Sequence, residues 1–204
     1  MRTVKTPQDR REDFLEAARA LFEERGVDET SVSDIIAKVG VAKGTFYWHF
    51  KSKEALLEAL AERRIGLFLE TIEPILADPG RNALEKLRDL WRVHEKERHT
   101  RTSLQCHVHK PENLLLHQKV RDIEAKALVP LLAEVIGQGN REGLFTTVDP
   151  ETTAAFLIMA QGLRLRQAEI TGKPEADTRE DAAQDILERV LGAAPGSLAF
   201  LSHG

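Results

Sequence analysis

The sequence predicts an all-α protein with a small N-terminal part and a larger C-terminal part. Apolar residues recur at helical spacing through most of the 204 residues, capping signals precede many of these stretches, and we identify no convincing strand. A chain of this length can hold a small domain joined to a larger one. We expect a first domain over residues 1–53 and a second over 54–204.

Three short elements are expected in the first part. In the stretch TPQD, residues 6–9, a cap, a proline and an acid begin a helix that ends at Gly26. Residues 31–34 resemble a capping box and begin a short amphipathic helix that ends at Gly40. A second short helix follows over about residues 43–50.

Five more helices are expected in the second part. They run from Ser52 to about Ala77, from about Leu84, over residues 111–137, from Asp149 and Pro150 onward, and over residues 178–191. Pro130 should kink or divide the third of these, and Gly137, Gly139 and Gly143 should mark its end. The small-residue tail after Gly192 is expected to fray.

Composition excludes several classes of protein. No apolar run approaches the length of about 20 residues that spans a bilayer, and the charged N-terminus lacks the apolar core of a secretory signal. The single cysteine, Cys106, is compatible with a reducing compartment, so we expect a cytoplasmic protein without membrane contact. The sequence has no glycine-rich nucleotide loop, nucleophile elbow or metal triad, and the five histidines between His94 and His117 lack good ligand spacing. We therefore expect no enzyme, no cofactor and no metal.

The charge is unevenly distributed. The formal net charge is −4, but residues 1–53 hold ten Lys and Arg against nine Asp and Glu, so the negative charge lies in the larger part. Residues 38–53 contain four lysines and no acid, which permits a local basic surface on an acidic protein.

The stretch VAKGTFYWHFKSK, residues 41–53, combines three of these lysines with four aromatic rings. Two short helices joined by the tight turn over residues 40–42 form a helix-turn-helix, whose second helix can enter the major groove of DNA. Phe46 and Phe50 lie four residues apart and should face a small core, which leaves other side chains for DNA contacts. A cluster of aromatic residues also fits a purely structural role in a core.

The stretch GVDETSVSDIIAKVGVAKGTFYWHFKSKEALL resembles the N-terminal DNA-binding domain of the TetR family of bacterial transcriptional regulators. The similarity covers roughly residues 8–60. It implies an all-helical homodimer of about nine helices per subunit, usually a repressor. The DNA-binding positions that the resemblance implies are Ser31, Ser33, Ala42, Lys43, Gly44, Thr45, Tyr47, Trp48, His49 and Lys53. His49 also fits a solvent-exposed or core role.

For the larger domain, the family implies an effector pocket in the middle helices and a dimer interface in the last two long helices. Candidate ligand-binding residues are Trp91, Cys106, His107, Phe156, Met159 and Gln161. Candidate dimerisation residues are Phe156, Met159, Leu163, Ile186, Leu187 and Val190, although their apolar stripes could instead close the monomer core.

We therefore expect a homodimeric, sequence-specific DNA-binding regulator, a repressor that a small-molecule effector releases from a palindromic operator in double-stranded DNA. Two alternatives use the same DNA-binding domain. One is a ligand-independent regulator controlled by a protein partner, and the other is an activator.

Overall fold

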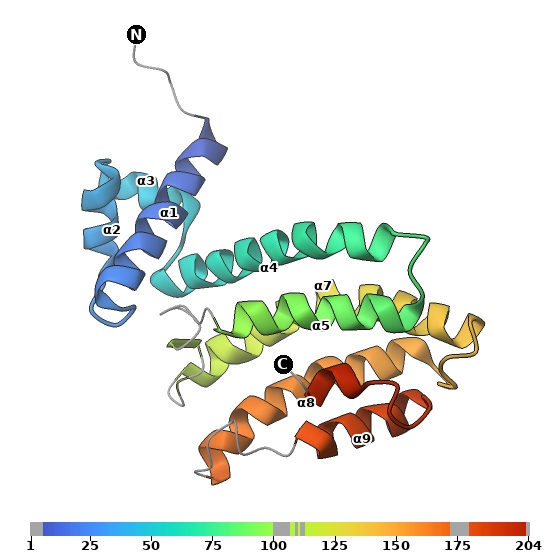
Figure 1. Ribbon diagram of the computed structural model, residues 1–204. Helices are drawn as coiled ribbons and strands as arrows, with labels where there is room; N and C mark the ends of the chain where they lie inside the picture. The colour runs from blue at the N-terminus through green and yellow to red at the C-terminus, as the bar shows by residue number, and fades with distance from the viewer. Residues whose placement is uncertain (1–5, 100–106, 109, 111–112, 172–179, 203–204) are drawn as a thin grey trace. The chain divides into compact units, whose positions relative to one another are not determined.

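The computed structural model describes residues 6–99, 107–108, 110, 113–171 and 180–202, and in this part the protein is all-α (Figure 1). The α-helices are α1 (Pro7–Arg25), α2 (Val32–Val39), α3 (Lys43–His49), α4 (Lys53–Ala77), α5 (Ala83–His99), α7 (Leu114–Arg141), α8 (Pro150–Thr171) and α9 (Glu180–Leu191), followed by the 3-10 helix η3 (Ala199–Ser202). No helix in the described ranges is long and apolar enough to cross a membrane.

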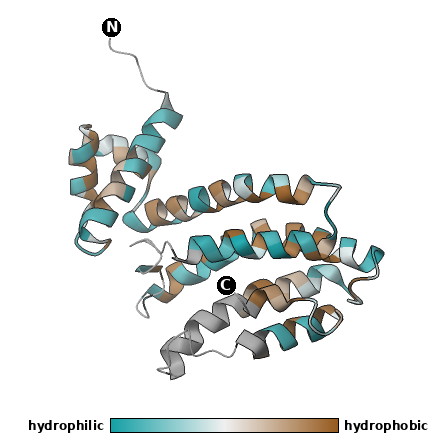
Figure 2. Cartoon of the chain, in the orientation of Figure 1, coloured by the Kyte–Doolittle hydropathy of each residue, from teal (hydrophilic) through white to brown (hydrophobic). Residues whose placement is uncertain are grey.

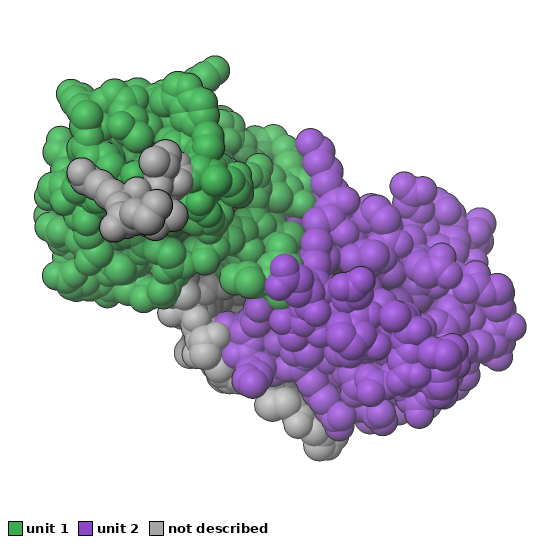
Figure 3. All heavy atoms as spheres, turned by 90° about the horizontal axis from the view of Figure 1, so that it is seen from above, with its two compact units in different colours: residues 1–67, 100–123 green, residues 68–99, 124–204 purple. Residues whose placement is uncertain are grey.

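The chain forms two compact units, coloured separately in Figure 3. Unit 1 comprises Met1–Leu67 and Thr100–Ile123, and unit 2 comprises Phe68–His99 and Glu124–Gly204. α4 and α7 therefore each contribute residues to both units.

Unit 1 is built around the aromatic and aliphatic side chains of α1 to α4. Its buried residues include Phe14, Leu15, Phe22, Ile35, Phe46, Phe50, Leu56 and Leu60. Val108, Leu116 and Val120 belong to the same core. Residues far along the chain thus complete the core of the N-terminal helices.

The N-terminal helices begin where the sequence predicts. Thr6 caps α1 through a capping box with Asp9, and Ser31 caps α2 through a capping box with Asp34. Gly40 ends α2 with φ of 73° and ψ of 41°, a left-handed conformation that glycine adopts without the steric cost of a Cβ. The predicted starts and ends of these two helices are confirmed.

Unit 2 packs its helices around a second core. Ala83, Val135, Ile136, Phe145, Ala154, Leu191 and Leu198 are buried together. Its helix α5 is rich in charged residues and is mostly teal in Figure 2, although most of its described side chains are at least half-buried.

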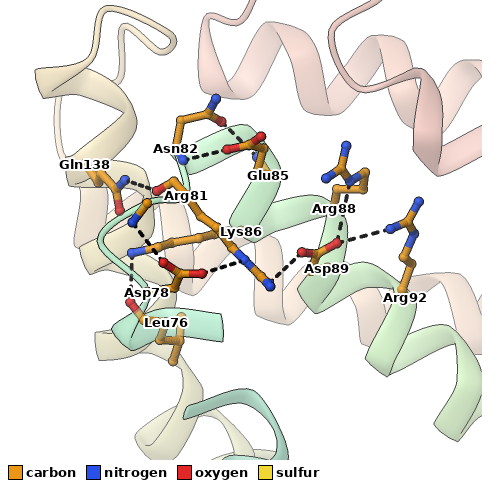
Figure 4. A network of polar contacts seen from close by, with 11 residues as sticks. Leu76, Asp78, Arg81, Asn82, Glu85, Lys86, Arg88, Asp89, Arg92 and Gln138 are labelled. Atoms are coloured by element: carbon orange, nitrogen blue, oxygen red, sulfur yellow. Dashed lines mark hydrogen bonds and ion pairs between the residues drawn. The ribbon is translucent and has the colours of Figure 1, made fainter. Parts of the chain in front are cut away.

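Ion pairs and hydrogen bonds fix the start of α5 (Figure 4). Arg81 donates to Asp89 at 2.7 Å and pairs with Asp78 at 2.9 Å. Lys86 is buried, with 7% of its surface exposed, and its Nζ donates to the Leu76 carbonyl at 2.7 Å. These contacts connect the end of α4 and the following turn to α5.

α7 differs from its prediction in two respects. Pro130 does not divide the helix, and the helix continues past Gly137 and Gly139 to Arg141, just before Gly143. Pro130 and Lys126 are exposed, so water can bond the Lys126 carbonyl that lacks a proline N–H partner, while apolar neighbours keep the helix packed.

The tail after Gly192 packs instead of fraying through residue 202. Leu198 is 1% exposed, and its N–H donates to Glu188 Oε1 at 3.0 Å. η3 follows this anchor, and Phe200 and Leu201 pack against the core of unit 2.

Candidate nucleic-acid interface

Buried phenylalanines fix the orientation of α3. Phe46 and Phe50 are 0% and 3% exposed, and their rings meet the Phe14 ring of α1 edge-on at centroid distances of 5.4 and 6.2 Å. Residues four apart lie on the same helix face, so the residues between these anchors face other directions. The predicted core role of both phenylalanines is confirmed.

The opposite face of α3 carries large exposed aromatic rings. Tyr47 and Trp48 are 47% and 71% exposed. The Lys43 Nζ lies 5.9 Å from the Tyr47 ring centroid, which places a cation beside the tyrosine. Ala42, Lys43 and Gly44 are exposed at the start of the helix, and Thr45 is half-buried. This face can offer a hydroxyl, an ammonium group, an indole N–H and slim backbone to a nucleic acid.

His49 lies between the two faces. Its ring centroid is 4.5 Å from that of Trp48 and 5.8 Å from that of Phe14. Burial lowers the pKa of His49, and the nearby Arg11 and Arg10 guanidinium groups lower it further. The imidazole is therefore neutral at pH 7 and could contact DNA by hydrogen bonding, without adding positive charge.

The serines of α2 have different local roles. Ser31 Oγ accepts from the Asp34 N–H at 3.2 Å and donates to Asp34 Oδ2 at 2.7 Å. The Ser31 backbone N–H also donates to Asp34 Oδ2, at 2.8 Å. The two bonds that the Ser31 hydroxyl and backbone N–H donate to this carboxylate lower the pKa of Asp34. Ser33 is exposed beyond this cap. Both serines lie at the exposed start of α2, where a DNA backbone can be contacted.

The lysines around α3 are mostly available for phosphate contacts. Lys38, Lys43 and Lys51 are exposed, and none has a carboxylate partner within the described residues. Lys53 is different, because its Nζ donates to the Val27 carbonyl at 2.5 Å. An ammonium group has three N–H donors, so this bond leaves two for a phosphate.

His107 and Lys110 contact Asp28 in the loop between α1 and α2, which no pattern in the sequence predicted. His107 Nδ1 is 3.2 Å from Asp28 Oδ1, and Lys110 forms an ion pair with the same carboxylate. Asn113 donates to the His107 carbonyl at 2.8 Å, and its Nδ2 is 3.1 Å from His107 Nε2. No local spacing signal could have found contacts between segments so far apart in the chain.

The other candidate residues lie on several helices. Trp91 is on α5, with its ring centroid 6.0 Å from that of His94. Phe156 and Met159 of α8 and Ile186 of α9 are exposed, whereas Leu187 and Val190 are half-buried. Cys106 lies outside the described residues, as do the side chains of Gln161 and Leu163 in α8. The ligand-binding and dimerisation roles of all these residues stay predictions.

Residues 14–60 match the family model described as "Bacterial regulatory proteins, tetR family". The uncharacterized HTH-type transcriptional regulator YvdT of Bacillus subtilis is 40% identical over 82 residues, which cover 40% of this chain and 38% of that protein. The matched stretch thus spans less than half of the length of this relative.

A longer match extends into the larger domain. The HTH-type transcriptional repressor KstR2 of Mycobacterium tuberculosis is 30% identical over 139 residues, 67% of this chain and 69% of that protein. The crystal structure of RolR in complex with resorcinol has the same fold, with a TM-score of 0.73, 18% identity, and coverage of 97% of this chain and 95% of that one. The family model over residues 14–60 and the KstR2 match point to the same family, and the protein belongs to the TetR family of helix-turn-helix transcriptional regulators, a non-enzymatic family.

Proposed function

We propose that the protein is a homodimeric repressor that binds a palindromic operator and is released from it by a small organic effector. The observation that carries the DNA-binding step is the orientation of α3, where buried Phe46 and Phe50 leave Tyr47 and Trp48 exposed beside Lys43. In this proposal residues 1–53 bind DNA, and residues 54–204 bind the effector and dimerise.

The roles on DNA follow from the chemistry of each side chain. Lys43 and Thr45, at the start of α3, reach base edges in the major groove. Tyr47, Lys53 and the α2 serines contact phosphates and fix the register of α3 on the duplex. Trp48, His49, Ala42 and Gly44 complete the contact face.

Dimerisation is proposed through α8 and α9. Phe156 and Met159 are 56% and 68% exposed on α8, and Ile186 is 56% exposed on α9. Large apolar side chains exposed on neighbouring turns of a helix favour burial against another surface. A second copy would place two α3 helices for two half-sites of a palindrome about one DNA turn apart.

Effector control is supported by the relatives and by α4. RolR was crystallised with resorcinol, and FadR from Bacillus subtilis with stearoyl-CoA. In this chain α4 runs without interruption from Lys53, directly after the helix-turn-helix, into unit 2. An effector that binds the larger domain more tightly in one arrangement of α4 would shift the population toward that arrangement and lower operator affinity.

The proposal is tested by selecting bound fragments from random duplex DNA with the purified protein at near-physiological salt. Enrichment of a palindrome is expected, and sequencing supplies the operator. Operator affinity is then measured with and without candidate effectors. A protein that enriches no sequence, and that native mass spectrometry shows to carry no bound ligand, would contradict the DNA-binding proposal.

A further inference from the structure

Two buried N–H donors on one face of α5 form no hydrogen bond within the described residues, although one of them lies 3.5 Å from the Asp89 carboxylate. Arg88 Nε and Trp91 Nε1 are both buried, and neither has a hydrogen-bond partner among the residues that the structure describes. Residues three apart in a helix lie on the same face, about 5–6 Å from Cβ to Cβ. A buried donor without an acceptor costs free energy, so two such donors on one helix face indicate a place where an acceptor binds.

The charge around Arg88 favours an anion. Arg81, Arg88 and Arg92 share the carboxylates of Asp78 and Asp89, which leaves more guanidinium than carboxylate charge in this cluster (Figure 4). Asp89 lies 2.7 Å from Arg81 and 3.2 Å from Arg92, but 3.5 Å from Arg88 Nε. Arg88 is therefore the arginine that Asp89 neutralises least.

Trp91 supplies an apolar surface beside this charge. Its indole stacks at a tilt of 33° with the His94 ring, and Leu87 and Leu90 of the same helix pack against the core of unit 2. Glu95 follows Trp91 by four residues, toward the C-terminus of α5, whereas Arg88 precedes Trp91 by three. An anionic group would therefore lie at the Arg88 end of this face.

We infer that the Arg88–Trp91 face of α5 binds the carboxylate of an organic acid, which is the effector class of this regulator. One carboxylate oxygen accepts from the Arg88 guanidinium and the other from Trp91 Nε1. This inference rests on the proposed function, because it names the effector for the site in the larger domain.

The alternatives fit less well. A neutral acceptor such as an ester carbonyl could satisfy Trp91 but would leave the charge of Arg88 unmatched. A dianion such as a phosphate monoester would bring two negative charges to one weakly paired guanidinium and leave one of them unmatched. A monoanion with an apolar body matches both the single weakly paired guanidinium and the indole.

The test uses the full-length chain with Trp48→Phe, in which Trp91 is the remaining one of two tryptophans and reports binding by its fluorescence. The probes are benzoate, octanoate and dodecanoate, each compared at neutral pH with its methyl ester. We expect at least one carboxylate to change the fluorescence with a Kd about tenfold or more below that of its ester, because a hydrogen bond to a charged group is worth about 1.5–3 kcal/mol.

Arg88→Gln should abolish this preference for the acid. The matched control is Arg92→Gln, since Arg92 lies one turn away, pairs with the same aspartate and has a side chain that is 68% exposed. Arg92→Gln should keep the preference, and circular dichroism on both variants verifies that they fold. Equal binding of acids and esters, or an unchanged preference in Arg88→Gln, would overturn the inference.

Operator binding by the parental protein, with Trp48 in place, separates this inference from the proposed function. If the protein binds its operator and no carboxylate binds Trp48→Phe, the regulator stands and the effector class is wrong. If a carboxylate binds with the expected preference and no operator can be selected, the site stands and its regulatory role is wrong.

Discussion

At the scale of single residues, adjacent residues of α3 have different roles, one in the core and one on the surface. Phe46 is fully buried and Tyr47 is half exposed, although both are aromatic and adjacent in sequence. The spacing of Phe46 and Phe50 predicted this division correctly. The half-buried position of His49 could not be predicted, because it depends on a ring contact with Phe14 of another helix.

Alanine substitutions should separate the two roles. Phe46→Ala should lower the free energy of unfolding by about 3–5 kcal/mol, since it removes a buried ring. Tyr47→Ala should change stability by less than about 0.5 kcal/mol. It should weaken operator binding about fivefold to tenfold per half-site by removing a hydrogen bond to a phosphate. Urea unfolding and fluorescence anisotropy with labelled operator measure the two effects, and an unchanged operator affinity in Tyr47→Ala would refute the proposed role of Tyr47.

His107 should make stability depend on pH. Burial lowers its pKa below the ordinary value of 6.5, and the Asp28 carboxylate opposes this shift only in part. As the pH falls below about 6.5, the unfolded chain takes up a proton before the folded chain does, so the free energy of unfolding decreases until the pH passes the lowered pKa. Denaturant unfolding at several pH values should show a smaller decrease in His107→Gln.

Asp28→Asn provides the complementary variant for His107. It removes the carboxylate that raises the pKa of the imidazole, so the loss of stability should extend to lower pH. Asp28 itself stays ionised in this range, because the Lys110 ammonium group holds its pKa below the ordinary value. A His107→Gln protein with the same pH dependence as the parent would show that this histidine does not cause the decrease.

At the scale of helices, local signals predicted the starts and ends of α1 and α2 but not the end of α7. Capping boxes at Thr6 and Ser31 depend on residues within one turn, so the sequence alone contains them. The end of α7 instead involves a packing contact. The Phe145 ring lies against Gly139 inside the helix, and no pattern within the helix indicates that contact.

Two glycines of α7 should respond in opposite directions to alanine. A Cβ on Gly139 would lie 2.0 Å from Phe145 Cδ2, whereas the nearest atom to a Cβ on Gly137 is Arg141 Nη1 at 3.5 Å, an ordinary contact. Gly139→Ala should therefore destabilise the protein by about 1–3 kcal/mol. Gly137→Ala should be neutral or stabilise it by up to about 1 kcal/mol through helix propensity. Equal melting temperatures for the two variants would contradict this account of α7.

At the scale of the whole molecule, the sequence predicted the helical fold and the helix-turn-helix but not how distant segments combine. Val108, Leu116 and Val120 complete the core of unit 1, and a periodic apolar pattern indicates which face is buried without naming its partner. The same ambiguity applies to α8 and α9, whose apolar stripes fit both a monomer core and a dimer interface. The exposure of Phe156, Met159 and Ile186 favours the interface.

Charge placed on this surface should dissociate the dimer and thereby weaken operator binding. Phe156→Glu and Met159→Glu would each bury carboxylates at the interface, twice per dimer because the same patch occurs on both subunits. The control is Val148→Glu, since Val148 is fully exposed at a bend before α8. Sedimentation equilibrium should give the monomer mass for the two α8 variants and the dimer mass for the control.

The same variants connect assembly to DNA binding. A monomer binds one half-site and contacts about half as many phosphates as the dimer does. The salt dependence of its DNA binding should therefore fall to about half that of the dimer. Its affinity for the full palindrome should fall to that for a single half-site, while Val148→Glu should bind like the parent. If Phe156→Glu and Met159→Glu remained dimers with parental operator affinity, α8 would not form the interface, and its exposed side chains would need another partner.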